Sequence, residues 1–221
     1  MASPAALLVS NLAKRYPGRE TPVLRDLNFS LAAGERLAIL GRNGQGKSTL
    51  IKMLGGVLAP TSGAISWSVT RSWPIGFAGG FQGSLTGYDN IRFLSRLYNK
   101  PISETLKAVE DFAELGEALT FPVKHYSSGM RARLAFGLSL AIEFDCYLID
   151  ELVAVGDSRF QKKCEEELFV HRADKSFILA SHDTNVISRH CSQALVVEAG
   201  YCRLFRDIDE ALDVYKWLRA P

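Results

Sequence analysis

The feature that most constrains the fold is the stretch from Gly41 to Thr49, which reads Gly-Arg-Asn-Gly-Gln-Gly-Lys-Ser-Thr. It fits the phosphate-loop pattern, in which a glycine and four further residues are followed by Gly-Lys-Ser. The apolar run at 37–40 predicts a buried strand before it, and residues 50–54 predict a helix after it. Strand, loop and helix in that order are the context that this pattern requires, so we expect an α/β fold.

The residue types suit a bound triphosphate. Glycines let the backbone approach phosphate closely, and the helix that starts near Lys47 points the positive end of its dipole at the same place. The Lys47 ammonium, at ~4 Å from a phosphate charge near the protein surface, gains about 4 kcal/mol before desolvation is subtracted. Ser48 offers a hydroxyl to Mg²⁺, which prefers oxygen ligands.

A glycine-rich turn with an exposed lysine is the alternative, and the strand–loop–helix context disfavours it. The loop residues expected to bind ATP are Gly41, Asn43, Gly44, Gln45, Gly46, Lys47, Ser48 and Thr49.

Composition bounds the class of protein. The 221 residues suit a single domain over 1–221, or a core with a subdomain. Hydrophobic residues make up 47% and charged residues 23%, which is typical of a globular protein. The net charge of +2 and the lack of a long block of like charge do not indicate a nucleic-acid partner.

The cysteines and the apolar stretches bear on location. Cys146, Cys164, Cys191 and Cys202 show no metal-ligand spacing, and we expect reduced thiols in a cytosolic protein. The N-terminus lacks the pattern of a signal peptide. The longest apolar stretch, 134–142, is far shorter than the ~20 residues that span a bilayer. We therefore expect that the chain does not cross a membrane by itself.

Strand and helix patterns alternate along the chain, which predicts a parallel sheet flanked by helices. Glycines cluster between 76 and 87 and predict a connection. A small helical subdomain is expected after it, over approximately 88–145. Further helices are expected from Ser158, over 184–190 and over 207–218. The expected strands are 7–9, 23–31, 37–40, 64–69, 146–149, 176–180, 194–197 and 202–205.

The phosphate loop forms one half of the expected site. We expect Asp150, directly after the strand at 146–149, to form the other half, which is acidic. Ligands of open α/β sheets gather at the carboxyl ends of strands, so Asp150 can reach an Mg²⁺ held by Ser48, directly or through water. Glu151 follows and could polarise an attacking water. General-base help of this kind is worth ~10²–10⁴-fold in rate. An acidic pair that merely faces solvent is the alternative.

Tyr126-Ser127-Ser128-Gly129-Met130 lies between the phosphate loop and Asp150, at the expected start of a helix. It resembles the signature motif of ABC-type ATPases, whose usual form is Leu-Ser-Gly-Gly-Gln. Ser127 and Gly129 match, whereas Tyr126, Ser128 and Met130 depart. The resemblance implies a P-loop ATPase core with a parallel sheet, a small antiparallel β subdomain and an inserted helical subdomain. It also implies that Ser127 and Gly129 contact the ATP bound by a second copy, in a dimer that closes on two ATPs.

Other residues match the family in its order along the chain. Gln82 falls where the Q-loop glutamine does, which implies a role in sensing Mg²⁺ and in coupling to the transport partner. Asp157 in Ala154-Val155-Gly156-Asp157 resembles the D-loop acid, and His182 resembles the switch histidine. The resemblance implies that Gln82 and His182 act in catalysis together with Glu151, and that Asp157 belongs to the ATP site. Tyr16 matches the aromatic residue that stacks on adenine. Taken singly, each could instead be structural.

Two stretches resemble one branch of the family. Residues 79–87 and 126–134 are similar to the Q-loop and signature of ATPases that export capsular polysaccharide in Gram-negative bacteria. The lipopolysaccharide O-antigen and teichoic-acid exporters are the nearby alternatives. Some O-antigen ATPases carry a C-terminal carbohydrate-binding domain, and the end of this chain soon after Trp217 favours the capsule type. Gln45 and Leu152 depart from the common alanine and valine, without removing a donor or metal ligand.

The resemblance implies a transport ATPase at the cytoplasmic face of the inner membrane. Its partners would be a second copy of the chain, separate integral membrane permease subunits, and periplasmic or outer-membrane export components reached through the permease. The cofactors implied are ATP and Mg²⁺, and no nucleic acid is expected. Two alternatives remain open: a soluble ABC ATPase that acts on DNA or ribosomes, and a P-loop kinase of small molecules. The first usually has paired cassettes or long coiled-coil inserts, and the second has no need of the signature.

Overall fold

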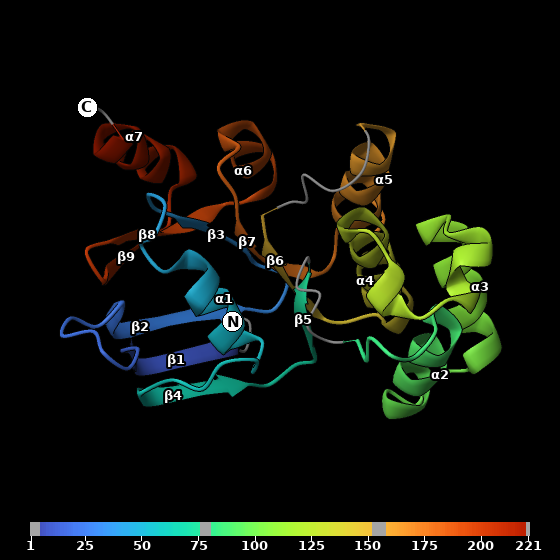
Figure 1. Cartoon of the computed structure of the whole chain (residues 1–221). Helices are drawn as coiled ribbons and strands as arrows, with labels where there is room; N and C mark the ends of the chain where they lie inside the picture. Colours follow the sequence, from blue (N-terminus) through green and yellow to red (C-terminus); the bar gives the residue numbers. More distant parts are fainter. Residues whose placement is uncertain (1–4, 76–80, 152–157, 220–221) are drawn as a thin grey trace. The chain divides into compact units, whose positions relative to one another are not determined.

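The computed structural model describes residues 5–75, 81–151 and 158–219 (Figure 1). The chain divides into two compact units. The first comprises residues 1–74, 145–152 and 174–221, and the second comprises 75–144 and 153–173.

A six-stranded sheet forms the centre of the first unit. In order across the sheet the strands are β5 (Arg71–Ile75), β6 (Cys146–Asp150), β7 (Ser176–Ala180), β3 (Arg36–Leu40), β8 (Gln193–Glu198) and β9 (Tyr201–Phe205). β3 pairs in parallel with β7 and with β8, β6 pairs in parallel with β7, and β9 pairs antiparallel with β8. The predicted parallel sheet is thus confirmed at its centre, and an antiparallel strand at one edge makes the sheet mixed. Central strands such as β7 are buried along their whole length, as expected for a sheet covered on both faces.

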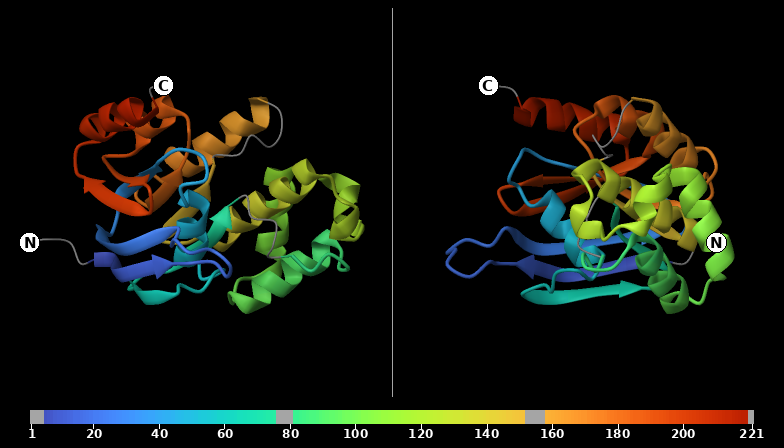
Figure 2. Two further views of the ribbon diagram at one scale, coloured as in Figure 1. Left: turned by 60° about the vertical axis from the view of Figure 1, so that its left-hand side comes forward. Right: turned by 45° about the vertical axis from the view of Figure 1, so that its right-hand side comes forward.

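A small antiparallel sheet completes the strands of this unit, in the order β2–β1–β4 (Figure 2). β1 (Ala5–Lys14) lies between β2 (Leu24–Ala32) and β4 (Ser62–Trp67) and pairs antiparallel with both. In β2, Leu27, Phe29 and Leu31 are buried while the residues between them are exposed. This period-2 pattern predicted the strand, and the small antiparallel sheet is confirmed.

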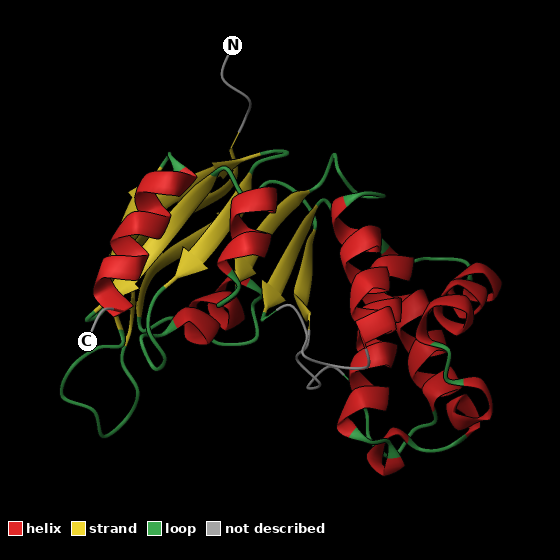
Figure 3. Ribbon diagram, turned by 90° about the horizontal axis from the view of Figure 1, so that it is seen from above, coloured by secondary structure: helices red, strands yellow, loops and turns green. Residues whose placement is uncertain are grey.

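The helix after the phosphate loop, α1 (Lys47–Leu54), lies between the two sheets and joins them into one core. Its Leu50, Ile51 and Leu54 are fully buried, and burial of each such side chain stabilises the fold by about 1.5–3 kcal/mol. Two further helices, α6 (Thr184–His190) and α7 (Ile208–Arg219), lie over the opposite face of the six-stranded sheet (Figure 3). The phosphate loop is therefore held by a helix that is packed on both sides.

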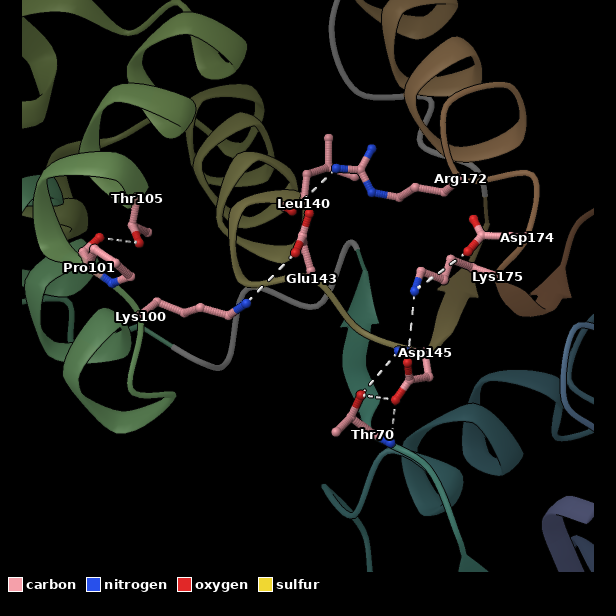
Figure 4. A network of polar contacts seen from close by, with 10 residues as sticks. All are labelled: Thr70, Lys100, Pro101, Thr105, Leu140, Glu143, Asp145, Arg172, Asp174 and Lys175. Atoms are coloured by element: carbon pink, nitrogen blue, oxygen red, sulfur yellow. Dashed lines mark hydrogen bonds and ion pairs between the residues drawn. The ribbon is translucent and has the colours of Figure 1, made fainter.

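The edge strand β5 was not predicted, because it is short and contains Pro74. Proline lacks a backbone donor and is found in sheets at edges. A polar cluster fixes β6 beside this segment. Thr70 Oγ1 donates to Asp145 Oδ2 over 2.6 Å, and Lys175 Nζ lies 3.8 Å from Asp145 Oδ1 (Figure 4). The Leu148 N–H donates to Ser72 Oγ over 2.9 Å.

The second unit is helical. Thr86 and Ser127 cap the N-termini of α2 and α4, each accepting a hydrogen bond from a backbone N–H of the first turn. Phe112 of α3 stacks on Phe136 of α4, with ring centroids 5.4 Å apart. Lys100 lies 3.7 Å from Glu143 (Figure 4). The helices are α2 (Gly87–Leu97), α3 (Ile102–Ala113), α4 (Ser128–Ile142) and α5 (Ser158–Phe169), with 3-10 turns at Gly116–Thr120 and Val123–His125.

A helix that spans a bilayer needs about 20 predominantly apolar residues. Across 5–75, 81–151 and 158–219, no helix combines the length and the apolar character needed to span a membrane.

Candidate active site

The phosphate loop links β3 to α1 through backbone that only glycine adopts easily. Gly44 and Gly46 have φ values of 82° and 103°. A Cβ on Gly46 would lie 2.7 Å from Val23 Cγ1, and one on Gly41 would lie 2.6 Å from Val197 O. Side chains at these positions would clash or strain the backbone, so the glycines fix the shape of the loop.

Gly46→Ala should therefore lower both the melting temperature and the affinity for nucleotide. The new methyl group meets Val23 at a residue with positive φ, and overpacking of this kind costs about 1–3 kcal/mol. Thermal unfolding measures the effect. Gly18→Ala is the matched control, because Gly18 has a φ of 78° but open space around the added Cβ. Equal melting temperatures for the two variants would contradict the steric argument.

Lys47 lies at the first position of α1 and is only 8% exposed. Its Nζ donates to Gly41 O over 2.7 Å and to Arg42 O over 3.1 Å, so the loop's own carbonyl groups hold the ammonium in place. Burial lowers the pKa of Lys47 below its usual value, while the carboxylates of Glu151 and Asp150 act in the opposite direction. A buried ammonium is costly unless it is paired, so an anionic ligand bound beside the loop would add to the pairing of Lys47.

Asp150 is the last residue of β6, and its Oδ1 accepts a hydrogen bond from Ser48 Oγ over 2.9 Å. The hydroxyl and the carboxylate thus present two oxygen atoms at one place, and this donor set fits Mg²⁺. Within the residues that the structure covers, no cluster of three or more His, Cys, Asp or Glu could hold a metal ion. A pair of protein oxygens agrees with the habit of Mg²⁺, which takes one or two protein ligands beside water and substrate phosphates.

Glu151 and His182 follow the carboxyl ends of two neighbouring strands, and their side chains lie close together. β6 and β7 are parallel and adjacent, with Asp150 in register with Ala180. The chain turns just past these ends, where Glu151 has a φ of 56° and its N–H donates to Ala180 O over 2.8 Å. His182 Nε2 then lies 3.3 Å from Glu151 Oε1. The strand register therefore brings together Glu151 and His182, two of the three residues that were predicted to be catalytic, the third being Gln82.

These groups surround one open cavity of about 480 Å³. Tyr16 lies at its wall, and its hydroxyl is 3.2 Å from Thr49 Oγ1, which ties the ring to α1. The side chain of Gln45 instead accepts a hydrogen bond from the Ala199 N–H over 2.8 Å, at the turn after β8. The lining residues are Tyr16, Arg19, Val23, Asn43, Gly44, Gly46, Lys47, Ser48, Thr49, Asp150, Glu151 and His182.

The remaining predicted residues belong to the second unit or fall outside the described residues. Gln82 donates from its backbone N–H to Asn90 Oδ1 over 2.9 Å. Ser127 Oγ accepts a hydrogen bond from the Met130 N–H over 3.2 Å, and Gly129 follows it in the first turn of α4. Asp157 lies outside the described residues. The roles of these four residues stay predictions.

Sequence reasoning missed Arg19 and Val23, which line the cavity, and Tyr215 of α7. The Tyr215 hydroxyl lies 3.1 Å from His182 Nδ1. Tyr215 belongs to no motif and is 33 residues from His182, so the sequence held no signal of this contact.

A phosphate loop after a central parallel strand, with a carboxylate from a nearby parallel strand against its serine, defines a P-loop nucleotide-binding protein. More particularly, the chain belongs to the ABC transporter family, whose model matches residues 24–154. Solved structures of this fold agree. The structure of an ATP-binding subunit of an ABC transporter superposes with a TM-score of 0.76 at 22% identity, covering 97% of this chain and 95% of that one. The expected family, fold class and nucleotide-binding character are thereby confirmed.

Two relatives are similar over nearly their whole length. The capsule polysaccharide export ATP-binding protein CtrD of Neisseria meningitidis serogroup B (strain ATCC BAA-335 / MC58) is 52% identical over 212 residues, which is 95% of this chain and 98% of that protein. The ATP-binding protein BexA of Haemophilus influenzae is 53% identical over 210 residues, covering 94% of this chain and 96% of BexA.

Proposed function

We propose that this chain is the ATP-hydrolysing subunit of an ABC exporter that moves capsular polysaccharide across the inner membrane. The proposal rests on the 52% sequence identity, over 95% of this chain, to a protein named for capsule polysaccharide export. Proteins named for teichoic-acid and O-antigen export match at only 36% and 34% identity, which favours the capsule class.

The site supports hydrolysis of ATP. The backbone of the phosphate loop and Lys47 hold the phosphates, and Tyr16 stacks on the base. Ser48 and Asp150 would hold Mg²⁺, which would neutralise charge on the phosphate oxygens. Glu151 polarises a water that adds to the γ-phosphorus as the bond to the β–γ bridging oxygen breaks, and the products are ADP and phosphate. His182 donates from Nε2 towards the γ-phosphate.

A second copy completes the site in this proposal. Ser127 and Gly129 of one copy contact the γ-phosphate bound by the other, and Asp157 contributes from the D-loop. Gln82 senses the metal and couples closure to the permease. A solved ATP-binding cassette of the same fold is a dimer bound to ADP and Pi, which supports a dimer.

The transport partners follow from the same class. Separate integral membrane subunits provide the pathway, so the chain works at the cytoplasmic face of the inner membrane. Periplasmic and outer-membrane export components connect through the permease. ATP-driven closure and reopening of the dimer is gating by a bound triphosphate.

The proposal is tested by isolating the chain with its membrane partner and identifying both that partner and the glycan that accumulates inside cells after deletion of the gene. We expect a polytopic permease, phosphate release in its presence, and intracellular capsular polysaccharide. Accumulated O-antigen or teichoic acid would move the chain to the alternative branches. Co-purification with ribosomes or DNA, or transfer of phosphate to a small-molecule acceptor, would overturn the transport proposal.

A further inference from the structure

The C-terminal helix α7 places a buried phenol beside Nδ1 of His182, the candidate catalytic histidine. Tyr215 is only 1% exposed, and its hydroxyl lies 3.1 Å from His182 Nδ1. The other ring nitrogen, Nε2, lies 3.3 Å from Glu151 Oε1. The imidazole is therefore held from both sides, by a hydroxyl and by a carboxylate.

The sequence of α7 explains why the phenol is fixed there. Asp207 Oδ1 accepts from the N–H of Asp209 over 2.8 Å and so caps the helix start. Ala211, Leu212 and Tyr215 are buried, which is the spacing of an apolar helix face. This face places Tyr215 inward as part of the packing of the helix, so the hydroxyl has little freedom to leave His182.

The chemistry of the two partners selects one form of the neutral ring. Nε2 lies 3.3 Å from Glu151 Oε1, within hydrogen-bond reach, and a carboxylate oxygen accepts hydrogen bonds, so a neutral ring satisfies this contact when Nε2 carries the proton. In that tautomer Nδ1 is an acceptor, and the phenol is a suitable donor to it. The hydrogen bond that one ring nitrogen makes sets the protonation of the other.

We propose that Tyr215 is a positioning residue that holds His182 in the Nε2–H tautomer, with Nε2 directed at Glu151 and the cavity. This inference rests on the proposed function of the cavity, since His182 acts there on the phosphate side. Tyr215 does not line the candidate active-site cavity but lies in an adjoining hollow that shares Asn43 and His182 with it, so Tyr215 acts through the histidine.

Tyr215→Phe keeps the buried ring and removes only the donor. We expect kcat for ATP hydrolysis to fall by about 10-fold or more, with KM nearly unchanged. Loss of the outer partner that orients a metal-binding histidine typically costs 10–100-fold, and Tyr215 holds the ring of His182 in a comparable way. The matched control is Tyr201→Phe, which removes a hydroxyl from an exposed residue of β9 in the same unit. Combined with His182→Gln, Tyr215→Phe should cause no further loss, because both act through one ring.

Nitrogen NMR of the full chain with labelled histidine rings reads the tautomer directly. The chain has four histidines, and the signal missing in His182→Gln assigns the one in question. We expect the Nε2–H form in the wild type, a changed Nδ1 signal in Tyr215→Phe, and an unchanged one in Tyr201→Phe.

An Nδ1–H form in the wild type would overturn the proposal whether or not the variant folds. So would a folded Tyr215→Phe, with a melting curve like that of the wild type, that keeps the wild-type kcat. The proposed function fails separately, through a wild-type chain that releases no phosphate alone or with its permease, whereas the NMR result does not depend on turnover.

Discussion

Glu151→Gln is expected to bind MgATP as the wild type does and to lose ATP turnover by about 10²–10⁴-fold. The amide keeps the size of the side chain but cannot accept a proton from water. Lys47 and Asp150, which are proposed to hold the nucleotide and its metal, stay intact. Without hydrolysis, a dimer of this variant that has closed on ATP cannot reopen. We therefore also expect a stable dimer when ATP is present.

Turnover by phosphate release, binding of a fluorescent ATP analogue and size-exclusion chromatography with and without MgATP measure these three properties. Glu166→Gln, which makes the same change at an exposed position of α5, is the matched control and should behave as the wild type. Wild-type turnover in Glu151→Gln would remove the residue from its proposed role. A chain that stays monomeric at saturating ATP in this variant would contradict the closed dimer.

The phosphate loop could be predicted because its residues are contiguous and its geometry is local. Gly46 precedes α1 and Lys47 is its first residue, so the contribution of both depends on the local chain alone. Asp150 was predictable for a related reason: the apolar run at 146–149 identified a central strand, and the carboxyl end of such a strand faces the ligand edge. A local pattern and one general rule of α/β sheets therefore sufficed to predict the phosphate loop and the carboxylate against its serine.

The rest of the site depends on pairings that the sequence does not encode locally. The approach of Glu151 to His182 follows from the adjacency of β6 and β7, and the order of strands across a sheet is not visible in the apolar patterns. The contact of Tyr215 with His182 needs the packing of α7 as well. Gln45 illustrates the same limit, because its side chain turns to Ala199, 154 positions away.

The start of α4 could be predicted from the sequence, whereas the edge strand β5 could not. Ser127 caps α4 through a contact within its own first turn, and the serine and glycine types at this position indicate such a cap. β5 is held by contacts with a distant segment, such as the bond from the Leu148 N–H to Ser72 Oγ. Tertiary contacts of that kind leave no periodicity in a strand that contains a proline.

Ser127→Arg is expected to abolish turnover, by about 10²-fold or more, while the monomer keeps its affinity for ATP. In the proposed dimer Ser127 faces the γ-phosphate of the other copy, and removal of one donor to developing charge costs ~10²–10³-fold. The long arginine side chain also prevents close approach of the two copies. Lys47, Ser48 and Asp150 belong to the first unit and are not altered.

Two controls separate the contact between copies from local damage. Ser127→Ala removes the cap of α4 alone, which costs about 0.5–2 kcal/mol of stability and shows in thermal unfolding. Ser103→Arg places the same side chain at an exposed position of α3 and should leave turnover unchanged. Binding of an ATP analogue to the monomer, measured at protein concentrations too low for dimers, decides the outcome. If Ser127→Arg weakens this binding as much as it slows turnover, Ser127 acts within its own subunit and the trans contact is wrong.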